Sequence, residues 1–190
     1  MLKNILTVSL LVLSVQVGSS QYKFEKEDRI KAKEVPVAAL EFIEECAFPK
    51  KTCWYREQGY DSVSIEGKTK HRGTKYSIEF DTLGNVEDVE YKIKWEDITE
   101  DAKAGILAYF DTKHSKTKIK KIQRQLTGSV LDLQQAMLTD EYIGTVTKYE
   151  IEVKAKIDGR YMLKEYLFDD KGGLVRESEV IYRNSDNLEF

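Results

Sequence analysis

Apolar side chains recur at helical spacing in two segments of the chain. The first stripe consists of Val35, Ala39, Phe42, Ile43, Cys46 and Ala47. Proline suits the first turn of a helix and the position beyond its end, so Pro36 and Pro49 predict a helix over about residues 36–47. The second stripe, next to the potential capping residue Thr99, consists of Ile98, Ala102, Ile106, Tyr109 and Phe110. A short extra helix is predicted over 129–140, where Ser129 and Asp132 have capping-box spacing.

Between and after these helices, apolar and charged residues alternate with the period of two that half-buried strands require. The segments predicted as strands are 51–58, 62–66, 75–80, 88–95, 118–126, 149–157 and 174–182. Pairing two strands across the hairpin signal Asp158-Gly159 places Ile151 opposite Tyr166 and Tyr149 opposite Phe168. Both pairs then fall on one face of the sheet, as a buried face requires.

One sequence motif occurs twice, each time downstream of a helix and between two strands. Phe80-Asp81-Thr82-Leu83-Gly84-Asn85-Val86 aligns with Phe168-Asp169-Asp170-Lys171-Gly172-Gly173-Leu174. In this Phe-Asp-x-x-Gly pattern, Gly84 and Gly172 suit tight loops because glycine tolerates positive φ, and the aspartates Asp81 and Asp169 suit turns because their side chains bond their own backbone. The repeat predicts two tandem units, residues 34–96 and 97–183, with an insertion near 127–147 in the second.

The two ends of the chain carry patterns of their own. Lys3, an apolar run from Ile5 to Val17 and the small residues 18–20 form the three-part pattern of a signal peptide. We therefore expect residues 1–20 to be removed, which places the protein in the periplasm or outside the cell. The apolar run is shorter than the roughly 20 residues of a spanning helix, and we expect no membrane span after cleavage. Residues 21–33 are predicted to be a charged leader or a first edge strand, and residues 184–190 a polar tail.

The order of elements resembles the PepSY-like domain of beta-lactamase-inhibitor-like proteins exported by bacteria. A helix, then strands, then a Phe-Asp-x-x-Gly hairpin occur twice behind a signal peptide. The resemblance covers most of residues 34–182. It implies an α+β fold in which each unit is a helix packed on an antiparallel four-stranded sheet. It also implies binding or inhibition of a protein of the cell envelope. The sequence leaves open whether the two units share one sheet.

The alternating strands separate aromatic side chains from charged ones. The apolar side carries Tyr76, Phe80, Tyr91, Trp95, Tyr149, Tyr166 and Phe168, and the opposite side carries Glu79, Asp88, Glu90, Lys92, Lys94, Glu150, Glu152, Lys154 and Lys156. Such a charged side is either an ordinary solvated surface or a surface for a polar partner. The inhibitor that names the family is implied to grip its enzyme with an aromatic-rich sheet face, so we do not expect inhibition of a beta-lactamase here.

Trp54 and Tyr55 are adjacent in a predicted strand, so their side chains face opposite sides of the sheet. One of these aromatics therefore stands on the charged side or at its rim, unless the helix end or the leader covers it. Exposed aromatics are typical interface anchors. The candidate interface consists of Trp54, Tyr55, Glu79, Glu90, Lys92, Lys94, Glu152 and Lys154. The expected partner is an envelope protein or peptide, and the alternative is a small-ligand or ion-binding module with a groove between the two units.

Residues that could carry out catalysis or bind metal are sparse. His71 and His114 are expected on the surface, since neither has cysteine or carboxylate partners at ligand spacing or belongs to a nucleophile motif. Asp81 and Asp169 lack the alternating oxygen ligands of a calcium loop. We predict no catalytic site, no metal and no cofactor.

Cys46 and Cys53 are the two cysteines of the chain. Export would allow them to form a disulfide, because disulfides persist in oxidising compartments. The distance between their Cα atoms decides whether they can pair, and the sequence leaves it open.

The charges of the chain are nearly balanced. Its 30 basic and 33 acidic residues give a net charge of −3 and are spread along its length. This balance argues against nucleic acid as the partner. It indicates no particular oligomeric state.

Overall fold

The computed structural model describes residues 21–23, 26–48, 50–59 and 62–180. The predicted signal peptide and the predicted polar tail lie outside these residues. The strands are β1 (Gln21–Lys23), β2 (Lys26–Ile30), β3 (Cys53–Gln58), β4 (Val63–His71), β5 (Thr74–Phe80), β6 (Val86–Lys92), β7 (Thr117–Thr127), β8 (Val146–Ile157), β9 (Arg160–Asp169) and β10 (Leu174–Val180). The α-helices are α1 (Val37–Glu45), α2 (Glu100–Lys113) and α3 (Val130–Thr139), and two short 3-10 helices cover Ala32–Glu34 and Trp95–Asp97.

All the described strands form one sheet, in the order β1-β10-β9-β8-β7-β6-β5-β4-β3-β2. Strands β2 to β10 pair with one another in antiparallel fashion, and β1 runs parallel to β10. The predicted α+β class with antiparallel pairing is confirmed, but the prediction of two units that each have a four-stranded sheet is wrong. Strands β6 and β7 pair from Val89↔Leu126 to Lys92↔Gln123, which satisfies two strand edges that separate sheets would leave open.

The register predicted around the Asp158-Gly159 turn is confirmed. Strands β8 and β9 pair Ile151 with Tyr166 and Tyr149 with Phe168. Both turn residues have positive φ, 47° at Asp158 and 81° at Gly159. A turn with two positive φ angles matches the twist of the flanking strands, which fixes this pairing.

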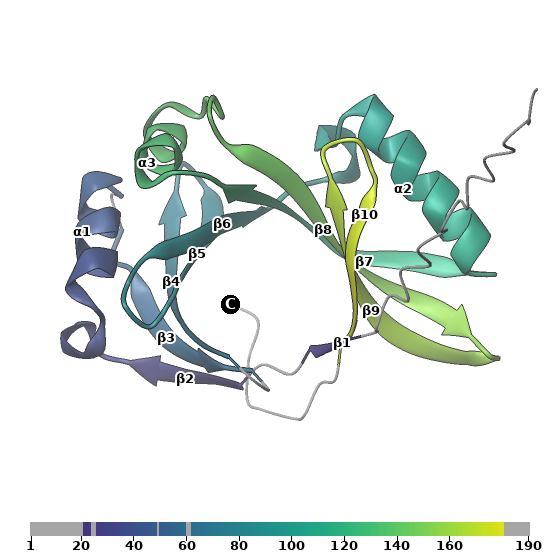
Figure 1. The fold of residues 1–190 in the computed structure, drawn as a ribbon, viewed down its shortest axis with the longest axis horizontal. Coiled ribbons are helices and arrows are strands. Elements are labelled where there is room, and N and C mark those ends of the chain that lie inside the picture. Colours follow the sequence, from purple (N-terminus) through teal and green to yellow (C-terminus); the bar gives the residue numbers. More distant parts are fainter. Residues whose placement is uncertain (1–20, 24–25, 49, 60–61, 181–190) are drawn as a thin grey trace, which may run out of the picture.

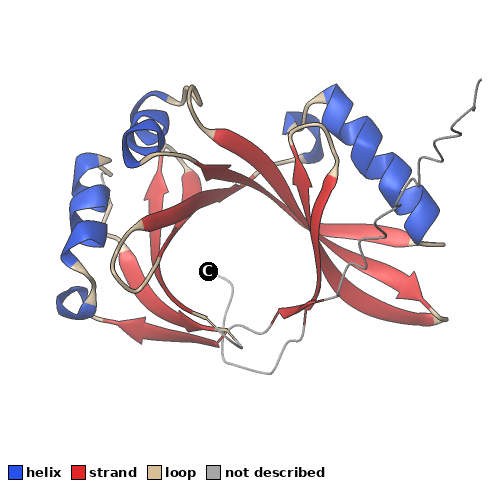
Figure 2. Cartoon of the chain, viewed as in Figure 1, coloured by secondary structure: helices blue, strands red, loops and turns tan. Residues whose placement is uncertain are grey.

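The three α-helices lie along the outer side of the curved sheet (Figure 1; helices are blue in Figure 2). Helix α1 packs Ala39 and Phe42 onto a first core that includes Ile78, Phe80 and Val89. Helix α2 covers a second core, to which it contributes Ala102, Ile106 and Phe110. None of the described α-helices covers the opposite side, which we call the inner face.

Helix α3 lies in the segment predicted as an insertion, and it ties the two halves of the chain together. It follows β7 in sequence, yet its buried residues Leu133, Ala136 and Met137 pack into the first core, beside α1. Ser129 caps its N-terminus by accepting a hydrogen bond from the Asp132 amide at 3.2 Å. The first core is therefore completed by residues of the second half.

The predicted leader supplies the outermost strand at both ends of the sheet. Strand β1 pairs with β10, whereas β2 pairs with β3 at the far edge. Only residues 24–25 separate β1 from β2, so the Cα atoms of Lys23 and Lys26 lie within about 11 Å of each other along an extended chain. The sheet is consequently curled until its edges approach, and its ribbon is strongly curved in Figure 1.

Candidate functional site

The inner face gathers most of the residues predicted as an interface. Strand register and alternation place Tyr55, Glu79, Glu90, Lys92, Glu152 and Lys154 on it. Trp54 points the other way, is 6% exposed, and packs in the first core 5.9 Å from the Phe80 ring. Lys94 is exposed and follows the end of β6, at the start of a 3-10 helix. Tyr55 is thus the aromatic of the adjacent pair that stands on the charged face, 5.0 Å from the Lys68 ammonium.

The middle of the inner face is buried, unlike an ordinary solvated surface. Its buried charged residues are Glu66, Asp88, Glu150 and Glu165, and they are all carboxylates. The glutamines Gln123 and Gln125 are buried between them. Burying a carboxylate is costly unless it is hydrogen-bonded or paired, and all four of these groups have interactions within the chain. The buried middle of the inner face is therefore acidic and is held by a polar network.

The two glutamines connect neighbouring carboxylates on β6. Gln125 Nε2 donates to Asp88 Oδ2 at 2.9 Å and to Glu90 Oε1 at 3.1 Å, and Gln123 Nε2 donates to Glu90 Oε2 at 2.8 Å. Neutral amide donors stabilise the ionised carboxylates without adding charge. This network fixes the side chains at the point where the two halves of the sheet join.

A second cluster joins β2, β3 and β4 through three carboxylates. Oxygens of Glu27, Glu57 and Glu66 lie within 4.8 Å of one another, a spacing that a metal ion could bridge. Lys68 Nζ lies 2.9 Å from Glu27 Oε1 and 3.0 Å from Glu66 Oε2, and Ser77 donates to the other oxygen of Glu66. Burial raises the pKa of Glu66 while Lys68 opposes that rise. Burial also disfavours the charge of Lys68, but Glu66 and Glu27 raise the pKa of its ammonium overall. A lysine thus already supplies the positive charge at this cluster.

The two cysteines are free, and the disulfide left open by the sequence is not formed. Cys46 is buried in the first core on the outer side of the sheet. Cys53 belongs to the inner face, where its Sγ lies 3.8 Å from Arg29 Nη2. The sheet separates the two thiols. Burial raises the pKa of the Cys46 thiol to about 12, so it stays protonated and unreactive at neutral pH.

The two Phe-Asp-x-x-Gly segments form the same turn. In each, Oδ1 of Asp81 or Asp169 accepts hydrogen bonds from the amides two and four residues later. Gly84 and Gly172 have φ values of 92° and 81°. Each glycine also meets a helix: a Cβ on Gly84 would lie 2.8 Å from Pro36 Cβ, and a Cβ on Gly172 would lie 2.4 Å from the Ala102 carbonyl oxygen. The motif therefore joins a hairpin to the N-terminal part of a helix.

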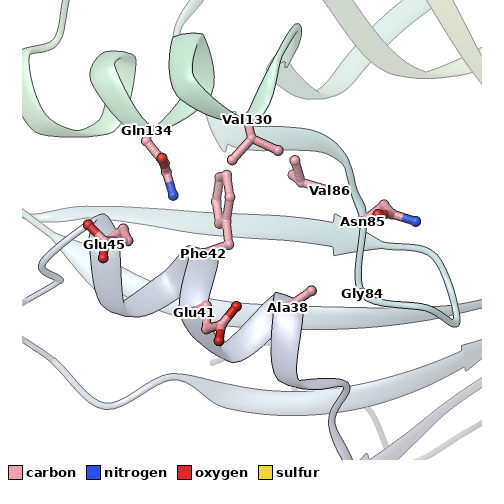
Figure 3. Close-up of a pocket in the computed structure, with 9 residues that line it drawn as sticks. All are labelled: Ala38, Glu41, Phe42, Glu45, Gly84, Asn85, Val86, Val130 and Gln134. Atoms are coloured by element: carbon pink, nitrogen blue, oxygen red, sulfur yellow. The ribbon is translucent and has the colours of Figure 1, made fainter.

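A groove of about 440 Å³ lies between α1 and α3 (Figure 3). Phe42 points toward α3 in Figure 3, with Gln134 and Val86 on either side of it and Val130 above it. Glu41 and Glu45 of α1 form its acidic edge. The apolar floor belongs to the first core, and Val130 is 48% exposed because the helices do not close over it.

The histidines are less exposed than the surface positions predicted for them. Both are partly buried. The ring of His71 packs 5.8 Å from the Phe48 ring, and its two nitrogens are buried without a hydrogen-bond partner in the described residues. His114 Nε2 lies 2.6 Å from the Tyr166 hydroxyl, beneath the end of α2. Sequence spacing could not show this, because Phe48 lies in the loop after α1 and Tyr166 lies on β9.

We expect the fold to lose stability as the pH falls below about 6.5, because of His114. Burial lowers the pKa of His114; nearby Glu177 opposes this effect, and Lys113 and Lys164 add to it. The unfolded chain then takes up this proton at a higher pH than the folded chain, so stability present above about pH 6.5 is lost as the pH falls. Urea unfolding at about pH 7.5 and about pH 5.5 would measure the loss.

The matched control is His114→Gln, which keeps a hydrogen-bonding side chain and cannot titrate. Its stability should change less between the two pH values than that of the unmodified chain. The Glu177 carboxyl titrates below this window. Burial raises its pKa, but Lys164 and Lys113 lower the pKa overall. An equal pH dependence in both proteins would show that His114 is not the group responsible.

Within the described residues, no helix has the length and apolar character needed to cross a membrane.

Comparison with known proteins shows a shared fold. No family model and no curated protein matches the sequence. Two solved structures of DUF2874 family proteins, from Bacteroides ovatus and Bacteroides uniformis, each have a TM-score of 0.51 and 9% identity to this chain. The matches cover 76% of this chain and 87% and 89% of the other chains. A BLIP-like protein from Bacteroides fragilis has a TM-score of 0.49 and 13% identity, over 82% of this chain and 92% of its own.

Proposed function

We propose that this chain is an exported, non-catalytic binding protein whose inner face receives a basic segment of an envelope protein or peptide. The export part of the proposal rests on the signal-peptide pattern of residues 1–20. The binding part rests on one observation: the charged residues buried on the inner face are carboxylates, and no described helix covers them.

An acidic surface of this kind favours lysine and arginine side chains. Carboxylates in a partly desolvated surface attract cations more strongly than carboxylates in water do, because the local dielectric is lower. Glu79, Glu90 and Glu152 are half-buried on the same face and extend the acidic band across three strands. These groups interact within the chain already, so a partner would exchange or extend those interactions. Electrostatic complementarity of this type sets specificity and association rate.

The exposed rim of the inner face offers an anchor for such a partner. Tyr161 on β9 is 56% exposed, and the Lys154 ammonium lies 4.9 Å from its ring centroid. A partly exposed aromatic beside a charged surface is a common centre of binding energy in protein interfaces. The sequence does not single out Tyr161, because this residue follows the hairpin turn and does not interrupt the alternation of its strand.

The non-catalytic part of the proposal is supported by the surroundings of the groups that could do chemistry. His114 bonds a tyrosine and His71 packs on a phenylalanine, so within the described residues neither histidine is hydrogen-bonded to a serine or cysteine. The Cys46 thiol is buried in the first core. A nucleophile and its general base need to lie within hydrogen-bonding distance of each other.

Site-specific photo-crosslinking in the exporting cell tests the proposal. A photoreactive amino acid at Glu152, on the inner face, should crosslink a partner protein, whereas the same residue at Leu107, 49% exposed on α2, should not. The double variant Glu79→Gln, Glu152→Gln, probed with the photoreactive residue at Tyr161, should reduce the crosslink severalfold while leaving the thermal unfolding temperature nearly unchanged. Equal crosslinking from Leu107, or an undiminished yield in the double variant, would refute binding at the inner face.

A further inference from the structure

A second groove lies on the outer side of the sheet, at the seam between the two halves of the chain. Its volume is about 470 Å³. Arg124 of β7 and Tyr149 of β8 come from the central strands, and Thr99 precedes α2. The remaining lining residues are Tyr142, Thr145, Val146, Thr147 and Asp170. This groove is separated by the sheet from the inner face, so what it binds is independent of the function proposed above.

Arg124 is held rigidly in this groove by neutral groups. Its Nη1 donates to the Tyr91 hydroxyl at 3.1 Å, and its Nη2 donates to the Asp97 carbonyl at 2.8 Å. The guanidinium carbon lies 5.8 Å from the Tyr91 ring centroid and 5.3 Å from the Tyr142 centroid. The Tyr91 hydroxyl in turn donates to the Tyr142 hydroxyl at 2.7 Å. Two aromatic rings and two hydrogen bonds therefore fix the guanidinium before any ligand arrives.

No carboxylate of the described residues forms an ion pair with Arg124, and its Nε is buried without an acceptor. A partly buried arginine in a folded protein usually pairs with a carboxylate or a phosphate, because cation–π contacts and neutral acceptors offset only part of its lost hydration. Its planar, forked donors match the paired oxygens of a carboxylate or a phosphate. A positive charge without an acidic partner, set in a hydroxyl-lined groove, is suited to an anionic ligand group.

Asp170, another lining residue, indicates what the rest of that ligand carries. Asp170, exposed in the turn between β9 and β10, makes no ion pair with Arg124. The Thr99 hydroxyl donates to the Asp170 carbonyl at 3.4 Å and ties this turn to the start of α2. Asp170 would repel a second negative charge on the ligand, whereas it would attract a positive group. The groove therefore favours a zwitterion over a dicarboxylate.

We propose that the seam groove binds a small zwitterionic ligand of the amino-acid or short-peptide class, with its carboxylate on Arg124 and its ammonium group toward Asp170. The threonine hydroxyls of Thr145 and Thr147 provide further polar contacts along the groove. The Tyr149 side chain, 2% exposed, forms an apolar wall against which a small side chain can pack.

Arginine side-chain NMR tests this assignment with three probes: sodium acetate, the dipeptide alanyl-alanine, and alanine amide, which lacks a carboxylate. The Nε–Hε signal of Arg124 is identified from its absence in Arg124→Lys, or by sequential assignment if that variant does not fold. Acetate and the dipeptide should shift this signal saturably at millimolar concentrations, alanine amide should not, and the signals of the other arginines should stay in place.

The variant Asp170→Asn separates the two ends of the ligand, and its exposed position makes a folding defect unexpected. It should weaken the dipeptide severalfold and leave acetate unchanged. The carboxylate site is overturned if neither probe produces a saturable shift, or if all arginines respond alike. Equal dipeptide affinity in Asp170→Asn overturns the role of Asp170. None of these results bears on the inner face, which the crosslinking experiment tests separately.

Discussion

Replacing Leu133 by alanine should lower the free energy of unfolding by about 2–5 kcal/mol. Leu133 of α3 is fully buried, with 0% exposure, and packs in the first core with Phe42 and Met137. Removing its isobutyl group loses the transfer free energy of the buried carbons and leaves a cavity that the neighbouring helix and strands cannot fully close. Denaturant unfolding followed by far-UV and aromatic signals would measure the loss.

The same helix provides the control. Leu131 lies two residues earlier and is 76% exposed, so Leu131→Ala should change stability by less than about 0.5 kcal/mol. Because α3 belongs to the second half in sequence and to the first core in space, we expect Leu133→Ala to retain one unfolding transition. Two transitions, with only one displaced, would show that the halves fold independently.

Replacing Gly172 by alanine should destabilise the fold by about 2–5 kcal/mol, from two separate causes. The first is its φ of 81°, a left-handed conformation that costs an L-residue about 1–2 kcal/mol. The second is contact: the new Cβ would lie 2.4 Å from the Ala102 carbonyl oxygen and 2.9 Å from Gly105 Cα, both in α2. Helix α2 would have to move away from the hairpin. Differential scanning calorimetry would record a lower melting temperature.

Gly159 isolates the second cause. Its φ is also 81°, yet no atom outside its immediate neighbours lies within 4 Å of an added Cβ. Gly159→Ala should therefore cost only the conformational part, about 1–2 kcal/mol. The difference between the two variants measures the helix contact alone. If both variants lose the same stability, the close packing of Gly172 against α2 contributes nothing.

The elements that sequence predicts correctly are those fixed by neighbours in the chain. Thr99 caps α2 by accepting a hydrogen bond from the Ala102 amide at 3.4 Å, and the Asp158-Gly159 turn sets the register of β8 against β9. The period of two in β5 and β8 identifies which side chains are buried, including Phe80 and Tyr149. Capping, turn geometry and alternation act over a few residues, so one sequence contains them.

The features that sequence misses depend on contacts between distant segments. Nothing local indicates that β6 pairs with β7, or that Leu133 completes the core of the other half. The alternation in β8 marks Glu150 as facing away from the helices, but its burial follows from the curl of the whole sheet. Arg124 looks like an ordinary strand residue, and its importance comes from Tyr91 and Tyr142, which lie on different elements.

The pairing of β1 with β10 gives the fold a late final step. The first described strand is completed by the last one, so the contact spans nearly the whole chain and contributes strongly to its contact order. When the chain appears N-terminus first, as during synthesis, this pair cannot form until Leu174–Val180 has also appeared. Until then the free backbone edge of β9, and later that of β10, is open to pairing with another chain. Truncation before residue 174 is therefore expected to produce an aggregation-prone protein.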